Sequence, residues 1–202
     1  RLAKPVLFAL CLGPLAWLGT QWWAGGLGAN PIEATNRFLG DWALRLLLVT
    51  LAVSPVREIF GWPRLATVRR MLGLFAFFYA ALHVASYVGL DQFFAWDEIA
   101  ADIAKRAYIT VGLAAFAILV LLAATSPAAV IKRLGAARWR RLHRLVYVAG
   151  ALGCLHYVMM VKADVRVPLL YATILALLLG WRWWRRSSGQ RSARAVLSPR
   201  AG

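Results

Sequence analysis

Three histidines, His83, His143 and His156, are the side chains of this sequence best suited to bind a redox cofactor. His83 and His156 each stand inside a long apolar run, where a polar side chain is costly and usually functional. Each lies about 12 or 13 residues into its run, and we expect both runs to cross a bilayer in the same direction. At 1.5 Å per residue, both imidazoles then lie some ~18–20 Å from the same membrane surface. Two imidazoles at one depth on separate helices are what a b-type haem with two axial histidines requires.

Two other interpretations of this pair stay open. A histidine inside an apolar segment can be a hydrogen-bonded core residue with no ligand. A zinc site is disfavoured, because no Cys, Asp or Glu stands at the same level to complete a tetrahedral set. Small residues near both histidines leave room for a flat cofactor, although they are also typical of plain helix packing in membranes.

His143 has a different setting, in a basic run at the start of the fifth apolar segment. It precedes His156 by 13 residues, a rotation of about 220° on a helix, so the two do not share a face. It could bind a second haem, contact a flavin or quinone, or be an interfacial residue. At the corresponding depth the third segment carries Arg69 and Arg70, so a second haem has no partner histidine there.

Arginines provide the remaining candidate contacts. Arg45 stands inside an apolar segment, one turn after Asp41. It is either the ion partner of Asp41, with its charge reaching toward the surface, or a partner of a haem propionate. Arginines of the inner loops are candidates for binding a flavin phosphate, although membrane proteins carry such clusters for topology alone. The candidates are Arg69, Arg70, Arg138, Arg140 and Arg141.

Six apolar runs must position these residues. The chain has 202 residues, of which 61% are hydrophobic, too many for the interior of a soluble domain of this size. The runs cover approximately residues 5–23, 38–54, 71–90, 107–125, 143–161 and 168–184. A hydrocarbon core of roughly 30 Å needs about 20 apolar residues, and only helices satisfy their own backbone there. We therefore predict an all-α membrane protein, a six-helix bundle over residues 1–186, with a basic and disordered cytoplasmic tail over 187–202. We expect the first run to be a retained helix and not a cleaved signal peptide.

The positive charge indicates orientation. A net charge of +16 could suggest nucleic acid, but the charges punctuate apolar runs and form no single basic face. The N-terminus, the loops over 55–70 and 126–144 and the segment from Arg182 hold 18 Lys and Arg, against 5 in the alternate loops. The positive-inside rule then places both termini in the cytoplasm. The sequence favours a multi-pass inner-membrane protein, with lipid and not nucleic acid as its partner.

Several segments resemble a known family over about residues 5–184. The most specific is Arg138-Trp-Arg-Arg-Leu-His-Arg-Leu-Val-Tyr147; the others are Asn30–Glu33, Gly40–Leu44, Arg69–Gly73 leading to His83, Lys105–Gly112 and Leu155–Tyr157. Together they resemble the MsrQ family, formerly YedZ. Its members are the haem-binding membrane subunits of the bacterial protein-methionine-sulfoxide reductase system, with a ferric reductase-like transmembrane fold.

The resemblance implies a function for each part. It implies transmembrane electron transfer through b-type haem, with FMN as a further cofactor, from the quinone pool or a cytosolic flavin reductase. The implied acceptor is a periplasmic molybdopterin subunit, which would carry the active site for methionine sulfoxide and leave this chain as the electron-transfer subunit. It also implies that His83 and His156 bind the outer haem and that His143 is the inner ligand. The wider superfamily usually has a second histidine near positions 69–70, where this chain has arginines.

Two alternatives belong to other classes of function. One is a stand-alone b cytochrome that oxidises quinol without the periplasmic partner. The other is a non-redox membrane transporter or assembly protein. A transporter is expected to carry an intramembrane acid or a pair of broken helices at the midplane, and the sequence shows neither clearly.

Overall fold

The structure is a computed structural model that describes residues 3–161 and 163–197, and every regular element in that part of the chain is helical. The elements are α1 (Ala3–Ala24), α2 (Pro31–Phe60), a 3-10 turn η1 (Pro63–Thr67), α3 (Arg69–Ser86), a π-helical turn η2 (Tyr87–Asp91), α4 (Trp96–Lys105), α5 (Ala107–Ala124), α6 (Ala128–Leu134), α7 (Ala136–Leu142), α8 (Leu145–Met160) and α9 (Arg166–Leu197). This agrees with the all-α class predicted from the sequence.

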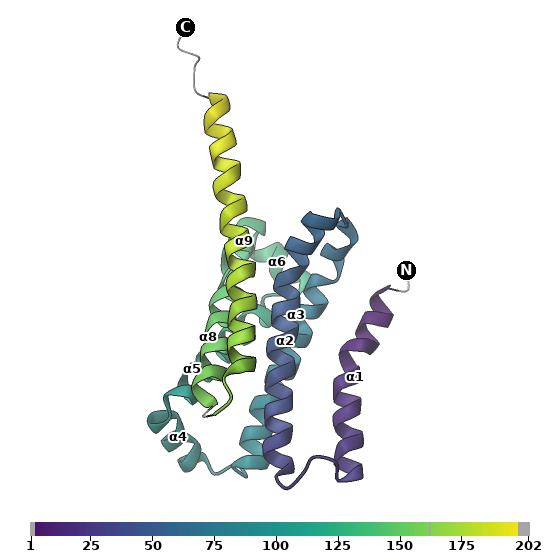
Figure 1. Cartoon of the computed structure of the whole chain (residues 1–202), viewed down its shortest axis with the longest axis vertical. Coiled ribbons are helices and arrows are strands. Elements are labelled where there is room, and N and C mark those ends of the chain that lie inside the picture. The colour runs from purple at the N-terminus through teal and green to yellow at the C-terminus, as the bar shows by residue number, and fades with distance from the viewer. Residues whose placement is uncertain (1–2, 162, 198–202) are drawn as a thin grey trace.

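The long helices α1, α2, α3, α5, α8 and α9 form a bundle (Figure 1). The most extensive contacts join α2 with α3 and α5 with α8. The connection between α2 and α3, the short α6, the start of α1 and the end of α9 lie toward one end of the bundle, while α4 lies at the other (Figure 1). The connections therefore alternate between the two ends in the order that the charge pattern predicts, although which end faces the cytoplasm stays a prediction.

Four helical segments are long and apolar enough to cross a membrane: Lys4–Ala24, Arg69–Asp91, Ala107–Ala124 and Arg166–Arg185. Large apolar side chains lie exposed on the bundle, Trp23 at 95%, as suits a surface in contact with lipid. The two other predicted spans correspond to α2, of 30 residues, and α8, of 16 residues. Their role as spans, and hence the six-span topology, stays a prediction.

The ends of α2 follow local chemistry. The Asn30 side chain accepts a hydrogen bond from the Glu33 backbone N–H at 3.1 Å, and Pro31 follows at the first helical position, where its missing N–H costs nothing. The helix ends at Gly61, whose φ of 64° lies in the left-handed region that glycine adopts most easily. α2 therefore begins seven residues earlier than its apolar run, since the capping residues lie in the preceding loop.

Pro55 interrupts α2, and a neighbouring helix compensates. Proline has no N–H, so the carbonyl of Leu51, one turn earlier, has no donor within the helix. Arg182 of α9 donates its Nη2–H to that carbonyl at 2.6 Å, and its Nη1–H to the Tyr147 hydroxyl on α8 at 2.9 Å. One guanidinium thus joins three helices. The charge pattern groups Arg182 with the basic residues at the cytoplasmic end of the chain, and the fold places its guanidinium between α2, α8 and α9.

Pro14 interrupts α1 in a similar way. The hydroxyl of Tyr79 on α3 donates to the Cys11 carbonyl at 2.8 Å and accepts from the Leu15 N–H at 3.2 Å. In a regular helix those two backbone groups bond to each other, so the hydroxyl is inserted between them. Tyr79 is fully buried and lies one turn before His83, so this contact also fixes the helix that carries the histidine.

The division into a helical domain over 1–186 and a tail over 187–202 stays a prediction. α9 continues as a helix to Leu197 and projects beyond the rest of the bundle (Figure 1). Residues 198–202 lie outside the described part of the chain.

Candidate functional site

His83 and His156 lie next to each other inside the bundle. They come from α3 and α8, which both run from the end that carries α6 toward the end that carries α4 (Figure 1). Their ring centroids are 6.2 Å apart, and the ring planes make an angle of 75°. The structure therefore brings together the two histidines that the sequence placed at one depth.

The backbone of two further helices holds the imidazoles. Nδ1 of His83 is 2.9 Å from the Asn36 carbonyl oxygen on α2, and Nδ1 of His156 is 2.7 Å from the Tyr108 carbonyl oxygen on α5. A carbonyl only accepts, so each Nδ1 carries the proton and donates it. Nε2 of each ring then has a free lone pair, the form of imidazole that binds a metal.

Glycines make room for both rings. A Cβ at Gly40 would lie 3.1 Å from Nδ1 of His83, and a Cβ at Gly112 would lie 2.7 Å from Nδ1 of His156. The second distance is shorter than real Cβ contacts, so no side chain fits there while the imidazole keeps its position. Each imidazole consequently packs directly on the backbone of the adjacent helix.

The pair fits the axial ligands of a haem. A metal–imidazole bond is about 2 Å long and the ring centre lies roughly 1 Å behind the nitrogen, so two imidazoles on opposite sides of one metal have centres about 6 Å apart. The observed 6.2 Å agrees with this separation. Among the residues that the structure describes, no group of three or more His, Cys, Asp or Glu side chains could hold a metal ion. Two protein ligands suit a metal that brings its own equatorial ligands, as haem iron does.

His143 lies in the turn between α7 and α8, at the end of the bundle opposite to α4. Its Nε2 is 3.2 Å from the Thr125 hydroxyl, and its ring packs on the indole of Trp139 with centroids 4.1 Å apart. The Trp139 indole N–H donates to the Thr125 carbonyl at 3.0 Å. Arg69, at the start of α3, lies close enough for its charge to act on His143.

The other candidate arginines lie at the start of α3 and in α7. Arg69 is half-buried, with Nη1 3.4 Å from the Ser54 hydroxyl. Arg70, Arg138, Arg140 and Arg141 are exposed. Their role in binding a flavin phosphate stays a prediction.

Arg45 forms the expected ion pair with Asp41, one turn earlier on α2. Its Nε–H also donates to the Tyr171 hydroxyl on α9 at 2.6 Å, a partner that the sequence did not reveal. Its role as a propionate partner stays a prediction.

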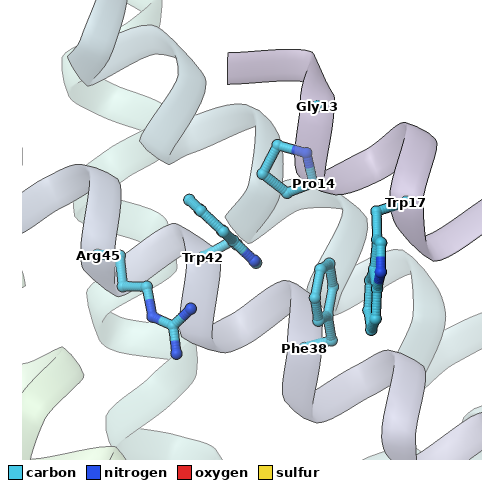
Figure 2. Close-up of a pocket in the computed structure, with 6 residues that line it drawn as sticks. All are labelled: Gly13, Pro14, Trp17, Phe38, Trp42 and Arg45. Atoms are coloured by element: carbon cyan, nitrogen blue, oxygen red, sulfur yellow. The ribbon is translucent and has the colours of Figure 1, made fainter. Parts of the chain in front are cut away.

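A shallow hollow of about 270 Å³ lies between α1 and α2, lined by Gly13, Pro14, Trp17, Phe38, Trp42 and Arg45 (Figure 2). Trp17 and Phe38 stack with centroids 5.0 Å apart, and the Arg45 guanidinium lies 5.2 Å from the Trp42 ring centroid. On a helix, Phe38 and Trp42 are each rotated by about 160° from Gly40. The hollow therefore lies on the face of α2 that is turned away from the histidine pair.

Sequence reasoning missed four groups of the site: the carbonyls of Asn36 and Tyr108 and the glycines Gly40 and Gly112. A backbone carbonyl leaves no mark in a sequence. The glycines did have a signal, since each stands inside an apolar helical run where glycine costs about 0.5–1 kcal/mol relative to alanine. That cost indicates a close approach by another group, but it does not reveal which one.

The chain is similar to a known protein family and to several named proteins. The family model for the ferric reductase like transmembrane component matches residues 39–154. The protein-methionine-sulfoxide reductase heme-binding subunit MsrQ of Rhodospirillum rubrum is 54% identical over 195 residues, which cover 96% of this chain and 94% of the relative. The proteins of the same name from Caulobacter vibrioides and Polaromonas naphthalenivorans are 48% and 52% identical, over 93% and 90% of this chain and 88% and 84% of each relative.

Proposed function

Because the chain belongs to the MsrQ family of heme-binding subunits, within the ferric reductase-like transmembrane components, we propose that it conducts electrons through a b-type haem held by His83 and His156. The chain is a membrane protein, and a transmembrane electron-transfer role fits its family and its apolar helices. The observation that carries the proposal is the separation of 6.2 Å between two imidazoles that both keep Nε2 free.

The protein's own groups prepare the site for such a cofactor. The carbonyls of Asn36 and Tyr108 hold each ring in one tautomer, so neither histidine has to reorient to bind iron. Haem supplies one-electron redox chemistry, and its potential is tuned by the axial ligands and their hydrogen bonds. Small residues of α8, Ala149 and Gly150 among them, are buried, and a Cβ at Gly150 would lie 3.4 Å from Leu175 on α9, so these residues allow close helix packing.

The proposed topology has six spans, with both termini in the cytoplasm of a bacterium and the protein in its inner membrane. The alternation of connections between the two ends of the bundle supports this arrangement, as does the excess of Lys and Arg at the end near α6. The histidine pair then lies in the periplasmic half, toward α4, while His143 and Arg69 lie near the cytoplasmic surface.

The proposed electron path uses both halves. Electrons enter from quinol or a cytosolic flavin reductase and leave to a periplasmic molybdopterin subunit that reduces methionine sulfoxide in proteins. The relatives are named as subunits of a protein-methionine-sulfoxide reductase, which supports an active site for the sulfoxide on a partner. The proposal also includes FMN near the arginines of the inner end, with His143 as its contact or as a ligand of a second haem.

The proposal is tested on the purified protein by haem and flavin stoichiometry and by reduced-minus-oxidised spectra. We expect low-spin b-type haem in the wild type and almost none in His83→Ala or His156→Ala. His143→Ala is the matched control, because it removes an imidazole at the other end of the bundle and should leave the haem of this pair in place.

Two results would contradict the proposal. One is a wild-type protein that inserts fully into the membrane, receives haem during expression and shows no Soret band. The other is haem loss in His143→Ala with full retention in both variants of the pair. Electron delivery to a co-purifying molybdopterin protein separates the proposed role from that of a stand-alone quinol-oxidising cytochrome.

A further inference from the structure

The two histidine contacts are built in the same way. Asn36 and Gly40 stand four residues apart on α2, and His83 on α3 meets both: the carbonyl of the first and the bare Cα of the second. Tyr108 and Gly112 stand four residues apart on α5, and His156 on α8 meets both in the same order. The spacing from glycine to histidine is 43 residues in the first case and 44 in the second, counted from the residue numbers 40, 83, 112 and 156.

We propose that Gly40 and Gly112 are positioning residues, which set the hydrogen bond on each haem ligand and thereby the potential of the haem. The inference rests on the proposed function, since it assumes that His83 and His156 are the haem ligands. It assigns to the two glycines a role that helix packing alone does not require.

Helix geometry explains why both positions take glycine. In an α-helix the carbonyl of residue i points toward residue i+4 and accepts its N–H, and one lone pair of the oxygen remains free. An imidazole that donates to this lone pair must lie beside residue i+4. Any Cβ there enters the space of the ring, at 3.1 Å from Nδ1 in one contact and 2.7 Å in the other. The carbonyl and the glycine therefore act as one unit.

The hydrogen bond matters because it acts on the metal through the ring. Donation from Nδ1–H to a carbonyl raises the basicity of Nε2, and a more basic ligand stabilises ferric over ferrous iron. It also fixes the rotation of each ring, and here the two planes differ by 75°. Nearly perpendicular axial imidazoles give ferric low-spin haem a strongly anisotropic electron paramagnetic resonance spectrum, so ring rotation is directly observable.

Alanine at either position should weaken the hydrogen bond and raise the midpoint potential. Gly112→Ala should have the larger effect, because its Cβ contact is the shorter one. We expect about a tenfold change in the ferrous-to-ferric preference, which corresponds to about 59 mV for one electron. Haem affinity should fall by about 10- to 100-fold, as for other partners of metal ligands.

The chain offers matched controls. A Cβ at Gly73 on α3 meets only the Thr50 methyl group at 3.6 Å, an ordinary contact, and a Cβ at Gly19 on α1 meets nothing within 4 Å. Gly73→Ala tests whether any added methyl group on the helix of His83 changes the haem. Gly19→Ala tests the effect of helix propensity alone.

The experiment measures potential, haem content and paramagnetic resonance on the four purified variants and the wild type. The inference is supported if both variants have a higher midpoint potential than the wild type, Gly112→Ala by more than Gly40→Ala, with shifted spectra and unchanged controls. Haem loss from folded Gly40→Ala or Gly112→Ala also supports it. A wild-type potential and a wild-type spectrum in both Gly40→Ala and Gly112→Ala would overturn the inference. If Gly112→Ala does not fold, the milder Gly40→Ala decides, and if neither folds, the glycines act in packing and the inference is wrong. A wild type without haem refutes the proposed function and this inference with it, whereas a wild type with haem and unchanged glycine variants refutes the inference alone.

Discussion

The contact between Arg182 and Pro55 allows a quantitative test of how the bundle is held together. Arg182→Met removes the guanidinium and leaves the Leu51 carbonyl, whose residue is only 1% exposed, without the donor that Pro55 cannot supply. Hydrogen bonds to charged groups contribute about 1.5–3 kcal/mol. Hydrogen bonds between membrane helices average only about 0.6 kcal/mol, because partners are also found in the unfolded chain. The Leu51 contact should lie above that average, since it is short, charged and has no alternative donor in its own helix.

Pro55→Ala provides the complementary change. Alanine restores a backbone N–H one turn after Leu51, so the carbonyl keeps a partner when Arg182 is lost. In a double-mutant cycle, Arg182→Met should therefore cost about 1–2 kcal/mol less in the Pro55→Ala background than in the wild type. The bond to Tyr147 at 2.9 Å and the contact with its ring are lost in both backgrounds and cancel in the cycle.

The assay is reversible unfolding in mixed detergent micelles, followed by far-UV circular dichroism. Tyr147→Phe serves as the control, because it removes the other hydrogen bond of Arg182 and its cost should not depend on residue 55. An equal cost of Arg182→Met in both backgrounds would refute the argument, since the carbonyl would then not need the arginine.

Two further substitutions test contacts between helices. Tyr79→Phe should destabilise the protein by about 1–3 kcal/mol, because its hydroxyl bridges the Cys11 carbonyl and the Leu15 N–H near Pro14. The same unfolding assay should show little change for Tyr108→Phe, whose hydroxyl accepts an exposed hydrogen bond from Arg106 at 3.3 Å. Tyr171→Phe should cost about 1 kcal/mol, less than Arg182→Met, because Arg45 is 43% exposed and keeps its ion pair with Asp41; a loss equal to that of Arg182→Met would contradict this ranking.

Much of the candidate site was accessible from the sequence. The prediction that His83 and His156 lie at one depth needed only the apolar runs, the rise per residue and the alternation of direction. The pairing of Arg45 with Asp41 needed only the spacing of one helical turn. These properties depend on one helix at a time, so a sequence shows them directly.

The partners of the histidines were not accessible in this way. The carbonyls of Asn36 and Tyr108 belong to helices more than 45 residues away along the chain, and apolar patterning does not say which helices are neighbours. The glycines Gly40 and Gly112 stood in apolar runs with many other small residues. Only their contact with an imidazole distinguishes them from glycines that meet nothing.

The sequence by itself determined that this chain forms apolar helices and that two histidines share one depth, because hydrophobic length and helical rise are local properties. The tertiary structure decided what each polar group meets. By sequence, Arg182 belongs to a run of basic residues at the end of the last apolar segment. In the fold it donates a hydrogen bond to the Leu51 carbonyl, which has no backbone donor because Pro55 lacks an N–H. The physical reason is that a buried backbone carbonyl must find a donor, and where proline removes the N–H of its own helix a side chain of a neighbouring helix can provide one.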